Sequence, residues 1–127
     1  MSRLLVVDDE ANIRMLYNEE LADEGYEVIT ASNTAEATEK LQQTAFDLVI
    51  LDIKLKNENG IELLQKIVRE RHDMPVILCS AFSCYKDDFS AWLADGYVVK
   101  SGDLTELKQE IVRVLAKKAQ KTKTGLQ

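Results

Sequence analysis

Five polar residues stand where apolar stretches of the sequence end, and their chemical types fit phosphoryl transfer. Asp8 and Asp9 follow "LLVV", and Asp52 follows "DLVIL". Ser80 follows "PVILC", and Lys100 follows "YVV". Carboxylates make an oxygen-rich site for a hard cation such as Mg²⁺. A carboxylate beside Mg²⁺, with an ammonium and a hydroxyl in reach, can attack a phosphoryl group and hold it as an acyl phosphate.

The position of each residue suggests its role in that chemistry. Asp8 and Asp9 are adjacent and can hold a metal ion together, whereas Asp52 is a lone acid and therefore the candidate nucleophile. The Lys100 ammonium would neutralise phosphoryl oxygens as a point charge, and the Ser80 hydroxyl would donate a hydrogen bond to one of them. A single acid after a strand is usually a turn former or a helix cap, so the argument depends on finding all five at one edge.

Five short runs rich in β-branched residues alternate with helical patterns and must position these side chains. The runs are continuously apolar, which is typical of parallel strands covered on both faces. They span residues 3–7, 26–30, 47–51, 75–79 and 97–99. With right-handed crossovers, the alternation predicts an α/β fold of the flavodoxin-like type, a doubly wound (βα)5 parallel sheet of five strands in the order 2-1-3-4-5.

In such a sheet the five polar residues share one edge. Ligands bind beyond the carboxyl ends of the strands where the strand order reverses, which here lies between the first and third strands. Asp8 and Asp52 end those two strands. Two carboxylates about 5 Å apart repel by roughly 3 kcal/mol at an effective dielectric constant near 20, so a bound cation would offset the repulsion. The sequence therefore predicts a Mg²⁺ site at this edge.

Length and composition fit one compact domain. The chain has 127 residues, of which 46% are hydrophobic and 30% are charged. Its 16 basic and 22 acidic residues give a net charge of -6, which argues against nucleic acid or an anionic membrane as a partner. The sequence has neither a membrane-span pattern nor a secretion-signal pattern, so we expect a cytoplasmic protein. We assign residues 1–118 to the domain and residues 119–127 to a polar, basic tail or a linker remnant.

The whole pattern resembles the receiver domain of bacterial two-component response regulators, of the single-domain kind found in chemotaxis, over about residues 3–118. The shared motifs are "VVDDE", "LVILDIKLKNENG", "VILCSA" and "YVVK". The resemblance implies that Asp52 accepts a phosphoryl group from a histidine kinase. It also implies a Mg²⁺ ion held by Asp8, Asp9, Asp52 and the backbone carbonyl of Lys54.

The resemblance further implies how the signal leaves the domain. Ser80 and Tyr97 would move together on phosphorylation and change the face formed by the last two helices and the strand between them. Lys54 and Phe82 would flank the phosphoryl group, and their bulk predicts slow hydrolysis. The expected partners are a histidine kinase or phosphotransfer protein and an unidentified downstream protein. The domain would be a monomer or a phosphorylation-dependent dimer, and it would catalyse its own phosphoryl transfer and dephosphorylation without turning over a separate substrate.

One departure from the family pattern concerns the loop that follows the last strand. The family usually has a proline in a cis peptide after its lysine, whereas Ser101 follows Lys100 here. A cis peptide without proline costs about 2.5–4 kcal/mol, which favours a trans peptide without deciding the matter. The stretch from Ser80 to Lys100 is also about two residues shorter than is usual in the family, which makes the fourth helix the least defined element.

Two other functions remain open from the sequence alone. A Mg²⁺-dependent phosphohydrolase with Asp52 as nucleophile would need a second acid two residues later, where Lys54 stands. A pseudo-receiver that binds partners without phosphate would not need the complete set of acids, hydroxyl and ammonium.

Overall fold

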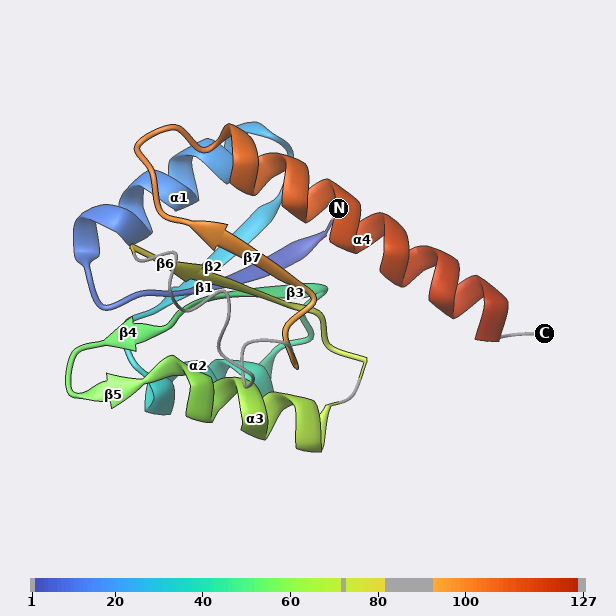
Figure 1. Ribbon diagram of the computed structural model, residues 1–127, viewed down its shortest axis with the longest axis horizontal. Helices are drawn as coiled ribbons and strands as arrows, with labels where there is room; N and C mark the ends of the chain where they lie inside the picture. The colour runs from blue at the N-terminus through green and yellow to red at the C-terminus, as the bar shows by residue number, and fades with distance from the viewer. Residues whose placement is uncertain (1, 72, 82–92, 126–127) are drawn as a thin grey trace.

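The computed structural model describes residues 2–71, 73–81 and 93–125, with side chains up to residue 119. Its described part is a five-stranded parallel sheet in the order β2-β1-β3-β6-β7 (Figure 1). The strands are β1 Arg3–Val7, β2 Glu27–Ala31, β3 Leu48–Asp52, β6 Val76–Ser80 and β7 Gly96–Val99. The helices are α1 Ala11–Asp23, α2 Thr34–Gln43, α3 Gly60–Glu70 and α4 Thr105–Gly125. A small antiparallel hairpin, β4 Lys54–Leu55 and β5 Glu58–Asn59, lies between β3 and α3.

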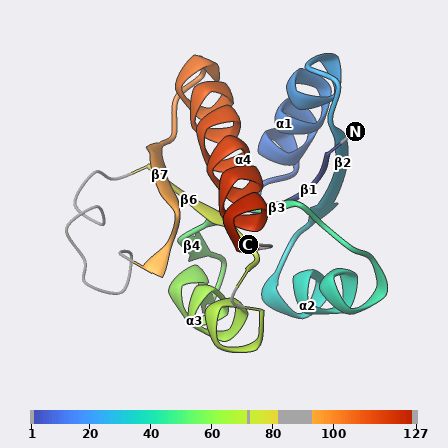
Figure 2. The same ribbon diagram turned by 90° about the vertical axis from the view of Figure 1, so that its right-hand side faces the viewer.

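The predicted fold class and strand order are confirmed, because β6 and β7 are the fourth and fifth strands of the sheet along the chain. Helices α1 and α4 cover one face of the sheet, and α2 and α3 cover the other (Figure 2). The first strand has its predicted bounds, and each of the others differs from its prediction by one residue at one end or both. The helix expected between β6 and β7 lies outside the described residues.

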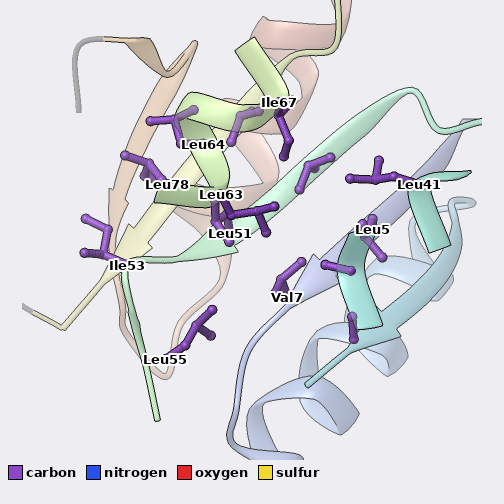
Figure 3. Close-up of a cluster of buried hydrophobic side chains, with 14 of the residues drawn as sticks. Leu5, Val7, Leu41, Leu51, Ile53, Leu55, Leu63, Leu64, Ile67 and Leu78 are labelled. Atoms are coloured by element: carbon purple, nitrogen blue, oxygen red, sulfur yellow. The ribbon is translucent and has the colours of Figure 1, made fainter. Parts of the chain in front are cut away.

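Burial on both faces explains why the strands are continuously apolar. Successive side chains of a strand point to opposite faces, so each strand contributes to two separate clusters. Leu5, Val7 and Leu51 pack against α2 and α3 in the cluster of Figure 3. Leu4 and Ile50 pack in the second cluster, on the side of α1 and α4. Both clusters hold the strand ends in place, which fixes the edge where the polar residues stand.

Asn or Asp followed three residues later by Glu predicts a helix start, and this pattern occurs at Asn33, Asn59 and Asp103. Asn33 Oδ1 accepts a hydrogen bond from the backbone N–H of Glu36 at 2.8 Å, which is the expected cap of α2. Asn59 and Asp103 also act at helix starts, but each accepts from the backbone N–H two residues later rather than three. The pattern of Asn or Asp followed by Glu therefore located the helix starts without fixing the partner of each cap.

Helix α4 extends further than the sequence indicated. Residues 119–127 were expected to form a polar tail, but the helix continues to Gly125. Ala, Gln and Lys are strong helix formers, so a helix anchored by Leu107, Ile111 and Val114 can propagate beyond its buried stripe. Among the described residues, no helix combines the length and the apolar character needed to cross a membrane. The domain boundary at residue 118 stays a prediction.

Gly60 lets α3 begin directly against the last residue of β3. A Cβ atom added to Gly60 would lie 2.1 Å from the backbone carbonyl oxygen of Asp52, and the Gly60 N–H donates to the Ile53 carbonyl at 2.6 Å. No side chain fits in this space unless the backbone that carries Asp52 moves.

Gly60→Ala is therefore expected to lower the free energy of unfolding by about 2 kcal/mol, as overpacking of rigid backbone does. Gly102→Ala is the matched control, because a Cβ atom at Gly102 would meet nothing within 4 Å. Urea unfolding monitored by circular dichroism measures both. Equal stability of the two variants would contradict the close approach.

Candidate phosphoryl-transfer site

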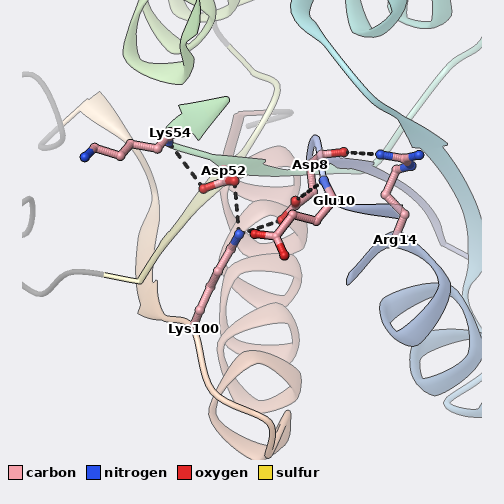
Figure 4. Close-up of polar contacts among 6 residues, drawn as sticks. All are labelled: Asp8, Glu10, Arg14, Asp52, Lys54 and Lys100. Atoms are coloured by element: carbon pink, nitrogen blue, oxygen red, sulfur yellow. Dashed lines mark hydrogen bonds and ion pairs between the residues drawn. The ribbon is translucent and has the colours of Figure 1, made fainter. Parts of the chain in front are cut away.

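The carboxyl edge of the sheet brings one lysine between two buried acids. Lys100 Nζ lies 2.7 Å from Asp8 Oδ2 and 3.0 Å from Asp52 Oδ2 (Figure 4). Asp8 follows β1, Asp52 ends β3, and Lys100 follows β7, so three separate strands supply the group. Only 2% of Asp8 and 4% of Asp52 is exposed, which makes the lysine their charge partner in a poorly solvated place.

The electrostatics of this group are set by burial and by the ion pairs. The pKa of Asp52 is raised to about 6, because burial and the neighbouring Asp8 raise it by more than the hydrogen bond from Lys100 lowers it. Burial would lower the pKa of Lys100, but the hydrogen bonds to Asp8 and Asp52 outweigh it and raise the pKa above its usual value. Lys100 is therefore fully charged at neutral pH. Asp52 is also ionised at neutral pH, but burial of its charge costs free energy.

A cluster of three carboxylates adjoins this group at the end of β1. One carboxylate oxygen from each of Asp8, Asp9 and Glu10 lies within 4.8 Å of the other two. A donor set made of carboxylates alone suits a hard cation such as Mg²⁺. Asp52 is not part of this compact set. The Lys100 ammonium links the Asp52 carboxylate to Asp8 by an ion pair with each acid. The site thus fits a metal ion, with Asp8 common to the cluster and to the ion pairs.

Lys54 contributes to the site through its backbone. Its N–H donates to Asp52 Oδ1 at 3.3 Å, whereas its side chain extends away from Asp52 (Figure 4). The backbone of Lys54 is therefore adjacent to the Asp52 carboxylate, where the sequence interpretation put a ligand carbonyl. Phe82, the other residue expected to flank the phosphoryl group, lies outside the described residues.

Ser80 and Tyr97 lie on neighbouring strands and on the same face of the sheet. Ser80 is 1% exposed, and its backbone carbonyl accepts the Lys100 N–H at 2.7 Å. Tyr97 pairs with Leu78, two residues before Ser80, and packs partly buried against the cluster on the α2 and α3 side. The described residues contain no cis peptide bond, so the Lys100–Ser101 peptide is trans.

Two residues near the acids were not identified as site residues from the sequence. Arg14 Nη1 donates to the Asp8 carbonyl oxygen at 2.7 Å, and the Glu10 N–H donates to Asp8 Oδ1 at 2.9 Å (Figure 4). Both contacts hold the loop that carries the acids. The sequence signal for Arg14 was its spacing. It lies four residues after Glu10, the last acid of the run, and residues four apart are neighbours on a helix.

Comparison with known proteins identifies the family. The sequence model of the response regulator receiver domain matches residues 4–112. The chain belongs to this receiver family. ArlR, a response regulator of Staphylococcus aureus, is 34% identical to the receiver over 123 residues, which are 95% of this chain and 56% of ArlR. The chain therefore spans about half the length of the curated relatives it matches.

Solved structures agree with the receiver fold. TrrA of Thermotoga maritima, a response regulator crystallised with Mg²⁺-BeF, is 47% identical over 90% of this chain and 99% of its own, with a TM-score of 0.86. The matched chain in the complex of the histidine kinase ThkA with TrrA is 48% identical over 91% of this chain and 99% of its own, with a TM-score of 0.85. A CheY-like receiver of Methanospirillum hungatei is 29% identical over 95% and 98%, with a TM-score of 0.89.

Proposed function

We propose that the protein is a phosphorylation-dependent signalling switch in which Asp52 accepts a phosphoryl group. The observation that carries this proposal is the buried Asp52 carboxylate, held by Lys100 beside the cluster of Asp8, Asp9 and Glu10. The crystal structure of TrrA with Mg²⁺-BeF supports it, since this chain is 47% identical to TrrA.

Each side chain has a role in the proposed transfer. An Asp52 carboxylate oxygen forms the bond to phosphorus as the bond to the donor's leaving group breaks, and the product is an acyl phosphate. Asp8, Asp9, Asp52 and the Lys54 carbonyl would hold Mg²⁺. That ion neutralises phosphoryl oxygens when it is bound. Lys100 is already at Asp52 and can transfer one of its hydrogen bonds to a phosphoryl oxygen, and the Ser80 hydroxyl can donate to another.

The proposed donor is a histidine kinase or a phosphotransfer protein, as the complex of ThkA with TrrA suggests by similarity. The output would be a change of the surface formed by α4, β7 and the segment before β7, transmitted by Ser80 and Tyr97, and read by a downstream protein. The chain would act in the cytoplasm, as a monomer or a phosphorylation-dependent dimer. It would return to its resting state by dephosphorylating itself, without turning over a separate substrate.

Intact-mass analysis tests the proposed function. The wild-type protein is incubated with a small acyl phosphate, with Mg²⁺ or with a chelator, and the modified residue is then located by peptide mapping. We expect one added phosphoryl group per chain, on Asp52, in the Mg²⁺ sample alone. Labelling of another residue, or equal labelling in the chelator, would contradict the proposal.

The lifetime of the phosphorylated state provides a second test of the site. As a proposal, Lys54 and Phe82 crowd the approach of the attacking water, so Lys54→Asn combined with Phe82→Ala should speed hydrolysis about tenfold. That factor corresponds to about 1.4 kcal/mol of activation free energy. The measurement is the decay of the phosphorylated fraction in excess Mg²⁺ after the donor is removed. The Lys54 side chain points away from Asp52 (Figure 4), so we expect Phe82→Ala alone to give most of the effect and Lys54→Asn alone to give the smaller part. Unchanged or slower decay in the double variant would refute the steric explanation.

A further inference from the structure

An interaction between two exposed segments joins the loop after Asp52 to helix α2. The Glu58 carboxylate accepts two hydrogen bonds from Thr34, one from its backbone N–H at 3.3 Å and one from its hydroxyl. Glu58 lies in strand β5 of the hairpin, and Thr34 is the first residue of α2. We call this pair of hydrogen bonds the Glu58–Thr34 clasp.

The helix side of the clasp is firmly anchored. Ala37 and Leu41 of α2 are buried in the cluster beneath the sheet, and Asn33 caps the first turn of the helix. Thr34 therefore sits on an element that cannot shift without disturbing the core. A carboxylate at the start of a helix is also favoured by the partial positive charge of the helix dipole.

Most of the hairpin side is exposed. Leu55 is its buried anchor, and its other residues are exposed: Lys54, Lys56, Asn57, Glu58 and Asn59. Asn57, in the turn, adopts a left-handed backbone conformation with φ of 61°. At its base, the Gly60 N–H bonds to the Ile53 carbonyl. The clasp is thus a further attachment of the hairpin, and it lies at strand β5.

The hairpin leads from the clasp back to Asp52 in two steps. Leu55 pairs with Glu58, and Lys54 pairs with Asn59, so Glu58 helps to fix the strand that contains Lys54. The Lys54 N–H in turn donates to Asp52 Oδ1 at 3.3 Å. A displacement of Glu58 would be passed through these pairs to the backbone of Lys54, whose carbonyl is a proposed Mg²⁺ ligand.

We infer that Glu58 and Thr34 are positioning residues, which hold the hairpin so that the Lys54 backbone is placed for metal binding at Asp52. This inference rests on the proposed function, because it requires Mg²⁺ at that site. By thermodynamic linkage, if the clasp strengthens metal binding, then metal binding strengthens the clasp by the same factor. The first turn of α2 therefore responds to the state of the site.

Mg²⁺ affinity, measured by isothermal titration calorimetry, is the principal test. Thr34→Val removes the hydroxyl without changing any charge and should weaken Mg²⁺ binding about threefold. Glu58→Ala, which removes both hydrogen bonds, should weaken it about fivefold. Thr34→Ser keeps the hydroxyl and should bind Mg²⁺ with the wild-type affinity. The double variant, Thr34→Val with Glu58→Ala, should be no weaker than Glu58→Ala alone, because both changes break the same clasp.

Two further measurements separate positioning from other effects. Glu62→Gln removes an exposed carboxylate from the start of α3 and controls for long-range charge, so it should bind Mg²⁺ more tightly than Glu58→Ala. Amide hydrogen exchange at Thr34 should slow when Mg²⁺ saturates the wild-type protein and should not respond to Mg²⁺ in Glu58→Ala. Urea unfolding in the absence of metal should show all variants folded and close to wild-type stability, since exposed pairs contribute little to stability.

The possible outcomes distinguish this inference from the proposed function. If the wild-type protein binds Mg²⁺ and is phosphorylated, but Thr34→Val and Glu58→Ala bind Mg²⁺ as it does, the inference is wrong and the function stands. Equal weakening by Glu62→Gln and Glu58→Ala would also overturn the inference, because charge alone would explain the result. A wild-type protein that neither binds Mg²⁺ nor is phosphorylated would overturn both.

Discussion

Asp52→Ala is expected to abolish phosphorylation by a small acyl phosphate, which is the largest effect we anticipate for any single substitution. The side chain of Asp52 supplies the oxygen that bonds to phosphorus, so no partial activity should survive its removal. The fold should persist, because the carboxylate is buried beside Asp8 at a cost, and its loss removes a like charge. Intact-mass analysis in excess Mg²⁺ measures the labelled fraction of the variant against the wild-type protein.

Asp23→Ala is the control for this experiment, because Asp23 is an exposed acid at the end of α1. It should be labelled to the same extent as the wild-type protein. Circular dichroism confirms that Asp52→Ala is folded before its labelling is compared. Labelling of Asp52→Ala at the wild-type level would show that another residue is the acceptor.

Lys100→Met is expected to destabilise the metal-free protein by about 3 kcal/mol at pH 8, the low end of the range for removing one partner of a buried ion pair. Without the ammonium, Asp8 and Asp52 face one another with no charge partner, although each is less than 5% exposed. Met keeps most of the aliphatic length of Lys, so the decrease in the free energy of unfolding measures the loss of the charge rather than the loss of packing. Urea unfolding in a chelating buffer measures it, and Lys56→Met, at an exposed position, is the matched control.

The pH dependence of this loss follows from the two pKa shifts. The raised pKa of Lys100 means that its stabilisation is complete below its usual pKa and is lost only in strong alkali, so at pH 8 the wild-type protein has all of it. The pKa of Asp52 is raised to about 6, and removal of Lys100 should raise it further. Asp52 of the folded variant therefore takes up its proton at a higher pH than Asp52 of the wild-type protein, so the deficit should shrink as the pH falls from 8 toward about 6 and should level off below that. Added Mg²⁺ should reduce it at pH 8, and a deficit unaffected by either change would contradict the electrostatic explanation.

The edge that carries the site could be predicted from the sequence because position in the chain determines it. In a parallel sheet every carboxyl end lies on the same side, so Asp8, Asp52 and Lys100 had to approach one another once the strands were assigned. The contacts within the site could not be predicted in the same way. Which carboxylate Lys100 pairs with depends on side-chain geometry, and the structure shows that it pairs with both.

Other features were missed where local signals are weak. Strands β4 and β5 have two residues each, too few for any periodic pattern, and most of their residues are exposed. Arg14 supports the site through a contact to the backbone carbonyl of Asp8, so its spacing four residues after Glu10 placed a basic residue near the acids without indicating the group that it binds. The continuation of α4 beyond Lys118 has no apolar stripe, and helix propensity alone is too weak a signal to set its end.

The position of β7 at the margin of the described sheet has a consequence for how the site can fail. Asp8 follows β1 and Asp52 ends β3, and both strands have neighbours on each side. Lys100 follows a four-residue strand that, within the described residues, pairs with β6 alone. Proteins open in cooperative segments, and marginal segments open at a lower free energy than the interior. When β7 separates from β6, the ammonium leaves the acids while the strands that carry those acids remain folded. Competence for phosphoryl transfer is then lost in a sub-global opening, before the protein unfolds.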